Sequence, residues 1–471
     1  MPINSFLYPA PSTPSFGYDV ANSVRTNKAD QPKGEVTQGT PTNVDKYTFS
    51  VWVKRADIGA SNSKIFSVSS GSTYGEEKLE FNQDDLIWRQ TRASDGETVW
   101  QRVTDRKFRD PSAWYHIVVA YDSSQGTAAN RCKMYINGVE ETSFSGSSNP
   151  SSGLDSYTNT SGRAFKFFTY LEDSNVTQDA TAYFAEMVYI DGQQLDQTSF
   201  GEFDSDSPNI WKPIDVSGLT FGNNGFYLDF EDSSDLGADV SGNNNDMNLT
   251  NIAAVNQSTD TCTNNFATLN SLVKGNASIT LSEGNLKGVF PGSWTAIPAT
   301  FGLTKGKWYF EAKNETSGQN AFIGVVTENQ DWDDSTPYDE TTGVVLYGPG
   351  GRKTVDGTDT DGFFATLSSG QIVGVALDLD SSTKTIQFSV NGTDTPNSTP
   401  VDLPSTFDDV FIFPYFSGNS SSATSNWQVN FGSPSYSISS GNSDANGYGN
   451  FEYSVPSGFY SINTKNLAEF G

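Results

Sequence analysis

Alternation of apolar and polar residues is the pattern that most constrains the fold of this chain. In Tyr47–Lys54 the odd-numbered residues are apolar, so their side chains share one face of an extended strand. No segment of ten or more residues shows the 3.6-residue period of a helix. The chain is therefore predicted to be all-β, with two tandem antiparallel β-sandwiches. Further predicted strands are 64–68, 78–81, 85–88, 98–103, 114–121, 307–313, 321–326, 343–347, 371–380, 385–391, 411–416 and 427–431.

Three strand-like runs end in a dipeptide that is typical of tight hairpins. These dipeptides are Asn137-Gly138, Asp191-Gly192 and Asn391-Gly392. Both central residues of a type I′ turn need positive φ, which Asn, Asp and Gly tolerate best. We therefore predict a β-hairpin at each of the three.

The strand pattern is lost between residues 257 and 275, which we interpret as a linker. Residues 18–256 are then the first sandwich with a trailing strand segment, and residues 276–471 are the second. Residues 1–17 contain four prolines and are predicted to be an extended arm. No signal peptide is predicted at the start, and no run of about 18 apolar residues predicts insertion into a membrane.

The charge balance argues against two classes of partner. The chain has 28 Lys and Arg against 56 Asp and Glu, a net charge of −28. Binding to nucleic acid or to an anionic membrane surface needs an excess of cations, so neither is expected. The acidity is uneven, because residues 201–471 hold 10 basic and 32 acidic residues.

Few residues are available for catalysis or metal binding. His116 is the only histidine, and it stands inside a predicted strand, which favours a packed, hydrogen-bonded role over that of a general base. The only cysteines are Cys132 and Cys262, too few for a cysteine-rich zinc site. Cys132 alternates in step with Met134 and Ile136, so its side chain is expected to face the core and to pack there as a small apolar group. We therefore predict that the protein is not an enzyme and needs no cofactor.

Two groups of aromatic and cationic residues are candidates for ligand binding. Aromatic rings stack on the C–H faces of sugars, and the Arg guanidinium grips carboxylates or phosphates. In the opposing interpretation, the tryptophans fill the core and the arginines lie on outer strand faces. The candidates are Trp88, Arg89, Trp100 and Arg102 in the first domain and Trp332, Tyr338, Tyr347 and Arg352 in the second.

Each domain contains motifs of a known family. The first resembles the concanavalin A-like, laminin-G-type jelly roll in the segments 47–54, 114–122 and 133–138 (Lys-Met-Tyr-Ile-Asn-Gly). The second resembles a SPRY (B30.2-like) domain in the segments 306–311 (Gly-Lys-Trp-Tyr-Phe-Glu), 323–325, 370–380, 388–392 and 429–432. The resemblances imply two sandwich folds that bind proteins or glycans.

The combination resembles tail-fibre and virion-surface proteins of marine bacteriophages, cyanophages in particular. The segments that carry this resemblance are 110–122, 224–230, 239–246 and 456–467. It implies a non-enzymatic virion protein, made in the infected host cytoplasm, that adheres to a host-surface glycan or protein. It also implies an oligomer that other virion proteins hold by the N-terminal arm. One alternative is a purely structural capsid decoration or knob.

The other alternative is a glycan depolymerase on the jelly-roll fold. Glu202, Asp204 and Asp206 faintly resemble the carboxylate array of laminarinase-type glycosidases. The last Glu of that array is missing and Pro208 follows, which favours an ordinary loop. Jelly-roll lectins often bind Ca²⁺, and the acidic loops 229–246 and 356–362 offer oxygen ligands. Neither loop matches an EF-hand, so solvated turns are favoured and a structural Ca²⁺ stays open.

Overall fold

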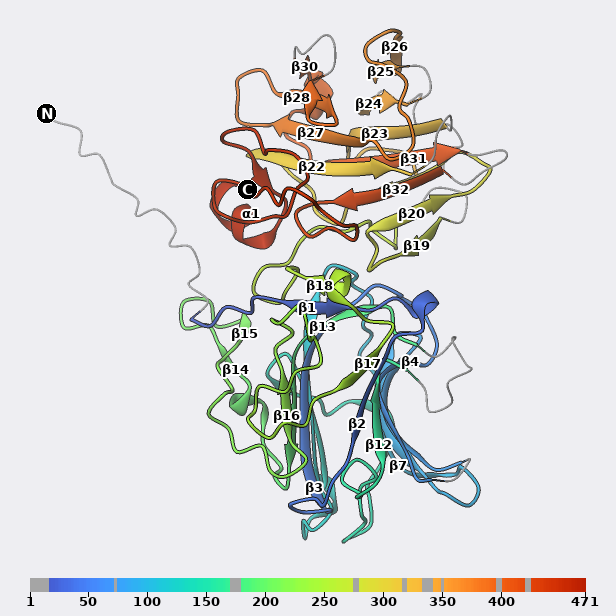
Figure 1. Cartoon of the computed structure of the whole chain (residues 1–471), viewed down its shortest axis with the longest axis vertical. Coiled ribbons are helices and arrows are strands. Elements are labelled where there is room, and N and C mark those ends of the chain that lie inside the picture. The colour runs from blue at the N-terminus through green and yellow to red at the C-terminus, as the bar shows by residue number, and fades with distance from the viewer. Residues whose placement is uncertain are drawn as a thin grey trace, which may run out of the picture.

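The computed structural model describes residues 17–71, 74–169, 179–273, 279–315, 320–332, 342–348, 351–394, 400–419 and 425–471. Two β-sandwiches lie end to end along the long axis, the first below the second in Figure 1. Each has its own apolar core, and one α-helix, α1 (Thr464–Phe470), is found in the part of the chain just given. The predicted all-β fold of two antiparallel sandwiches is confirmed.

The first sandwich packs two eight-stranded sheets face to face. The first sheet has the order β10 (Val139–Glu140), β9 (Cys132–Ile136), β8 (Trp114–Asp122), β3 (Lys46–Arg55), β13 (Ala182–Asp191), β1 (Ser23–Arg25), β18 (Gln257–Ser258), with β16 (Phe226–Leu228) also on β13. The second has the order β11 (Phe144–Ser148), β7 (Thr98–Thr104), β6 (Asp85–Thr91), β5 (Glu76–Asn82), β4 (Ser63–Ser69), β12 (Ala164–Phe167), β2 (Lys33–Thr37), β17 (Asn248–Thr250). A small hairpin, β14 (Gly201–Phe203) and β15 (Trp211–Pro213), lies beside them.

The second sandwich has sheets of nine and six strands. The nine-stranded sheet runs β19 (Thr280–Ser282), β20 (Lys287–Phe290), β32 (Ser425–Asn430), β22 (Lys307–Asn314), β27 (Ile372–Asp378), β28 (Thr385–Val390), β29 (Thr393–Asp394), with β30 (Val401–Asp402) on β28 and β33 (Tyr460–Ser461) on β22. The six-stranded sheet runs β21 (Thr295–Pro298), β31 (Ile412–Asn419), β23 (Asn320–Thr327), β24 (Gly343–Tyr347), β25 (Arg352–Val355), β26 (Thr358–Thr360).

Two of the three predicted hairpins form. Asn137 and Gly138 join β9 to β10, and Asn391 and Gly392 join β28 to β29, all four with positive φ. The prediction is wrong at Asp191-Gly192, because β13 pairs with β3 and β16 and no strand follows to close a hairpin. The Asp191 carboxylate instead accepts backbone N–H bonds from Thr42 and Asn224, which ties the end of β13 to neighbouring loops.

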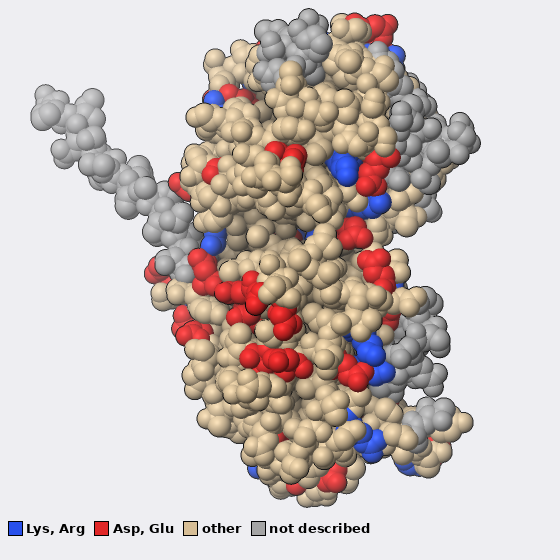
Figure 2. Space-filling view, viewed as in Figure 1, with Lys and Arg blue, Asp and Glu red and all other residues tan. Residues whose placement is uncertain are grey.

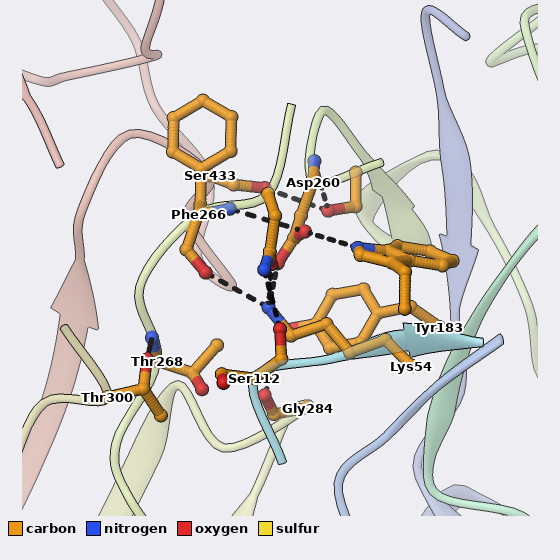
Figure 3. Close-up of polar contacts among 12 residues, drawn as sticks. Lys54, Ser112, Tyr183, Asp260, Phe266, Thr268, Gly284, Thr300 and Ser433 are labelled. Atoms are coloured by element: carbon orange, nitrogen blue, oxygen red, sulfur yellow. Dashed lines mark hydrogen bonds and ion pairs between the residues drawn. The ribbon is translucent and has the colours of Figure 1, made fainter. Parts of the chain in front are cut away.

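The segment predicted to be a linker is packed between the sandwiches. Its first residues form β18 in the first sheet of the first domain. The Asp260 carboxylate receives Lys54 Nζ at 2.7 Å, in a buried ion pair that Figure 3 shows. Asp260 also accepts a hydrogen bond from the Trp114 indole at 3.1 Å. Further along, Ala267 and Leu269 join the second core. The boundaries 256 and 276 stay predictions.

Direct contacts also join the two domains. Ser258 Oγ of the first lies 2.8 Å from Ser433 Oγ of the second, and Tyr183 donates a hydrogen bond to the Gly284 carbonyl at 2.9 Å (Figure 3). Gly284 has φ +65°, and a Cβ there would lie 2.3 Å from Tyr183 Oη, so only glycine fits. The two domains therefore meet in a close-packed interface at Gly284. Of the predicted arm, residues 1–16 lie outside the described part of the chain.

Candidate binding surface

The outer face of the six-stranded sheet carries a cluster of aromatic residues. Along β23 and β24, alternate residues such as Ile323 and Leu346 enter the core, and the residues between them face outward. We call the outward cluster the aromatic face. Its buried members are Ala296, Phe322, Val326, Val345 and Tyr415, and its half-buried rim is Trp294, Trp332, Tyr347 and Phe413.

Two residues predicted from the sequence meet on this face. Tyr347 and Arg352 are direct partners across β24 and β25. The Tyr347 ring stacks on Phe322 with centroids 4.6 Å apart, and the Arg352 guanidinium carbon lies 4.6 Å from the Tyr347 centroid. Arg352 Nη1 also donates to Asp359 at 2.5 Å, which fixes its plane over the ring. Burial raises the pKa of Tyr347, so its hydroxyl stays protonated at neutral pH.

Trp332, another residue predicted from the sequence as a binding candidate, lies on the same face. Its ring is 6.2 Å from the Tyr415 ring, and both belong to the aromatic cluster. Trp294, which sequence reasoning missed, packs 5.3 Å from Phe322. The feature of the sequence that could have indicated Trp294 as a surface residue is its position directly before the strand β21. Tyr338 lies outside the described residues.

The predicted site in the first domain does not form. Trp88 and Trp100 have no exposed surface and pack edge to face in the core, with centroids 4.8 Å apart. Their indole N–H groups donate to Tyr47 Oη at 3.0 Å and Gln90 Oε1 at 2.9 Å. Since neither ring reaches solvent, neither is available for stacking on a sugar, and the interpretation that the tryptophans fill the core is correct.

The two arginines of that group lie on opposite faces of the second sheet. Arg102 is buried and donates to the Ser148 carbonyl at 2.7 Å and to Asn149 Oδ1 at 2.6 Å. Burial lowers the pKa of Arg102. Arg89 is half-buried and pairs in register with Lys78 on β5, so it lies on the outer face. The four residues are therefore not one site.

The outer face of that sheet carries a charge ladder that the sequence analysis missed. Lys64 contacts Glu80 and lies 3.8 Å from Glu76, and Lys78 lies 3.2 Å from Glu76 and 3.1 Å from Glu80. Burial lowers the pKa of Lys64 to about 8. Burial raises the pKa of Glu80, but the two lysines lower it further, and the net shift is downward. The alternating pattern Glu-x-Lys-x-Glu in β5 could have predicted it, because alternate residues of a strand share one face.

His116 is a structural residue in this fold. The Trp211 indole donates to Nδ1 at 2.9 Å, so Nε2 carries the proton and donates to Ser50 Oγ at 2.9 Å. The ring also stacks on Trp52 with centroids 4.7 Å apart. Complete burial lowers its pKa to about 3, so His116 is neutral at physiological pH. It holds the β14–β15 hairpin against the first sheet.

The carboxylates of the suspected glycosidase array lie on that hairpin. Lys212 Nζ is 3.3 Å from both Glu202 and Asp204. Asp204 accepts backbone N–H bonds from Asp206 and Ser207, which lower its pKa. The Glu202 side chain is 58% exposed. These carboxylates cap a turn and bind a lysine, which supports the interpretation that they belong to an ordinary loop.

The two acidic loops use their carboxylates in the same way. Asp239 accepts hydrogen bonds from Tyr227 N and Asn245 N, and Asp359 binds Arg352 and Thr354. In the described ranges, no three His, Cys, Asp or Glu side chains are grouped to hold a metal ion. Within the same ranges, no helix has the length and hydropathy to cross a membrane. Both cysteines are free thiols.

Acidic side chains outnumber basic ones on the face drawn in Figure 2. Residues 201–256 contribute ten acidic residues and one basic residue, and the strands β14 to β17 place them in the first sandwich. The change in charge along the sequence therefore does not coincide with the domain boundary.

Comparison with known proteins defines the class of each domain. Residues 30–173 match the concanavalin A-like lectin/glucanases superfamily, in its laminin-G-type family model. Residues 307–434 match the SPRY domain family. The chain therefore contains a concanavalin A-like domain followed by a SPRY domain. No curated protein matches it.

Solved structures similar to this chain include three SPRY domains. The SPRY domain of human HERC1 is 14% identical, with 34% of this chain and 96% of that chain covered and a TM-score of 0.29. A human SPRY domain is 15% identical, with coverages of 32% and 94% and a TM-score of 0.26. The TRIM65 PSpry domain is 13% identical, with coverages of 35% and 91% and a TM-score of 0.27.

Proposed function

We propose that this protein is a non-enzymatic adhesion component of a phage virion surface, and that the aromatic face of its SPRY domain contacts a host-surface glycan or protein. The observation that carries the binding role is the half-buried rim of Trp294, Trp332 and Tyr347, with Arg352 stacked on Tyr347. Aromatic and Arg side chains with partial exposure are the residues that dominate interface energies.

The rest of the proposal has separate support. The resemblance of segments such as 456–467 to cyanophage tail-fibre proteins supports the virion setting. The two binding-type domains support adhesion, because concanavalin A-like and SPRY domains are generally protein or glycan binding modules. No specific contact favours the alternative of a capsid decoration. The depolymerase alternative also has no contact in its favour, because Glu202 and Asp204 both bind Lys212.

The test is binding of the purified chain to marine cyanobacterial cells and to polysaccharide extracted from their envelopes. Tyr347→Ala removes the ring between Phe322 and Arg352, so we expect affinity to fall at least tenfold, about 1.4 kcal/mol. Tyr74→Ala is the matched control, because Tyr74 is 59% exposed and lies in the other domain. Equal binding by both variants contradicts the proposed surface.

The same samples separate adhesion from degradation. The polysaccharide is incubated with the protein, and reducing ends and chain length are measured. We expect no change in chain length. Release of oligosaccharides that disappears in Glu202→Gln contradicts the proposal and supports a depolymerase.

A further inference from the structure

A buried lysine lies where the first sandwich meets the segment 257–275. Lys54 Nζ, near the end of β3, donates to Asp260 Oδ2 at 2.7 Å and to the Phe266 carbonyl at 3.0 Å (Figure 3). It also donates to Asn265 Oδ1 at 2.7 Å. Lys54 and Asp260 are each only 1% exposed. One amine, one carboxyl and one side-chain amide are therefore in mutual contact inside the protein.

The Asn265 amide is held in a fixed orientation beside this amine. Its Nδ2 donates to the Ser112 carbonyl at 2.5 Å, while its Oδ1 accepts from Lys54. Since a C=O bond is about 1.23 Å long, Cγ of Asn265 lies no more than about 3.9 Å from Lys54 Nζ. Reacting atoms about 3–3.5 Å apart are in a near-attack arrangement, so a small rotation of the amide brings Cγ within reach of the amine.

Burial of the amine and the carboxyl favours their uncharged forms. Burial lowers the pKa of Lys54, although Asp260 opposes this shift. Burial raises the pKa of the Asp260 carboxyl, although Lys54 opposes that shift in turn. Both shifts favour transfer of a proton from Nζ to Oδ2, which leaves a neutral amine beside a neutral acid. A neutral lysine amine in a desolvated site is a nucleophile.

The Asp260 carboxyl is positioned to move protons. Its Oδ1 accepts hydrogen bonds from the Trp114 indole at 3.1 Å and from Phe266 N at 3.4 Å. These two contacts direct the other oxygen, Oδ2, toward Lys54 Nζ. A carboxyl within hydrogen-bond distance of a nucleophile can serve as a general acid and base.

We infer that Lys54 and Asn265 form an intramolecular isopeptide bond, with Asp260 as the catalytic acid and base. The amine Nζ attacks Cγ of Asn265, and Asp260 takes one proton from Nζ and delivers one to Nδ2. The Cγ–Nδ2 bond then breaks, and Nδ2 leaves as ammonia. The product is an amide between Nζ and Cγ, so the reaction needs no oxidant, reductant or further reactant. Asn265 is half-buried, which gives the ammonia a route to solvent.

This bond ties β3 of the first sandwich to the segment that leads into the second. The two residues are 211 positions apart in the chain, so the bond closes a long loop and restricts the unfolded chain. The inference concerns a site apart from the aromatic face and does not depend on the proposed adhesion function.

The test is mass spectrometry of the purified full chain, intact and after protease digestion. We expect an intact mass that is lower than the mass of the unmodified sequence by one ammonia molecule. Digestion should yield a branched peptide that contains both Lys54 and Asn265. An intact mass equal to that of the unmodified sequence overturns the inference, and so does recovery of Lys54 in linear peptides only.

The decisive variant is Asn265→Ala, which removes the reacting amide and keeps the ion pair of Lys54 and Asp260. We expect it to show no loss of ammonia and no branched peptide. In denaturing gel electrophoresis it should also migrate differently from the wild type, because the bond persists when the chain unfolds. Asn270→Ala is the matched control that should keep the bond. Asn270 is half-buried in the same segment, and its Oδ1 accepts from Leu272 N at 3.1 Å.

A second variant tests the role of the carboxyl. Asp260→Asn removes the acid and base and should also abolish the branched peptide. Circular dichroism shows whether this variant folds, and if it does not, Asn265→Ala carries the test. A branched peptide that persists in folded Asp260→Asn contradicts the catalytic role. Loss of water in a link between Lys54 and Asp260 contradicts the assignment of Asn265.

Discussion

Two tryptophan pairs, one from each sandwich, lie in opposite environments. In the first, Trp88 and Trp100 are completely buried, and each indole N–H has a partner inside the core. In the second, Trp294 and Trp332 are half-buried on the outer face of a sheet. The same contrast holds for arginine, because Arg102 is buried against backbone carbonyls whereas Arg352 stacks on a surface ring.

The contrast teaches that an aromatic and cationic cluster in a sequence indicates a binding site only when the residues share an outward face. In the first sandwich, the buried charges of Lys64, Glu76, Lys78 and Glu80 pair with one another. The aromatic face of the second leaves ring surface partly exposed. Stability should therefore respond most to substitutions of core residues such as Trp88 and Trp100, and binding to those on the aromatic face.

The largest expected effect is in the first core. Trp100→Ala leaves a large cavity and removes the donor to Gln90 Oε1, so we expect the free energy of unfolding to fall by about 3–5 kcal/mol. Chemical denaturation followed by circular dichroism measures it. A loss below about 1 kcal/mol contradicts the core position of Trp100.

A pH dependence from His116 comes next. Its pKa is about 3 in the folded chain against a usual 6.5, so the unfolded chain binds the proton more readily between these values. The contribution of His116 to the free energy of unfolding is therefore fully present above pH 6.5. It is lost as the pH drops toward 3, and the loss is on the order of 4–5 kcal/mol. His116→Phe removes this part of the slope. Parallel profiles for the two proteins contradict a neutral, buried His116.

The charge ladder gives a smaller effect. Glu80→Gln removes the carboxylate that contacts the buried Lys64 and leaves Glu76 at 3.8 Å, so we expect the free energy of unfolding to fall by about 2–3 kcal/mol. The double variant Glu80→Gln, Lys64→Met removes both charges and is expected to recover most of that loss. If the double variant is as unstable as the sum of the single variants, the two residues are not coupled.

The smallest stability effect is expected on the aromatic face. Trp332→Ala removes a half-buried ring near Tyr415, so the free energy of unfolding should fall by about 1 kcal/mol or less. Binding to the cyanobacterial cells should still weaken at least tenfold, about 1.4 kcal/mol. If Trp332→Ala loses binding only because the variant is unfolded, the aromatic face has no separate role in binding.

Local patterns predicted most of the secondary structure. Alternation located strands such as β3 and β8, and Asn-Gly located the turns at 137–138 and 391–392, because these preferences act over a few neighbouring residues. The turn at Asp191 was wrong because distant backbone donors at Thr42 and Asn224 capture its carboxylate. The packing of segment 257–275 between the sandwiches was not predicted, because polar residues such as Asp260 pair with residues that are distant in the sequence, such as Lys54.

The order of residues along the chain was enough to predict two all-β sandwiches, with motifs that match a concanavalin A-like domain and a SPRY domain. Which face of each strand is buried depends on how the sheets pack in three dimensions. In β7, Trp100 and Arg102 alternate with Val99, Gln101 and Val103, so each parity mixes apolar and polar residues. The packing of one sheet on the other placed Trp100 inside, whereas the outward parity of β24 brought Tyr347 to the surface. Burial depends on contacts between residues far apart in the chain, and alternation within one strand does not contain that information.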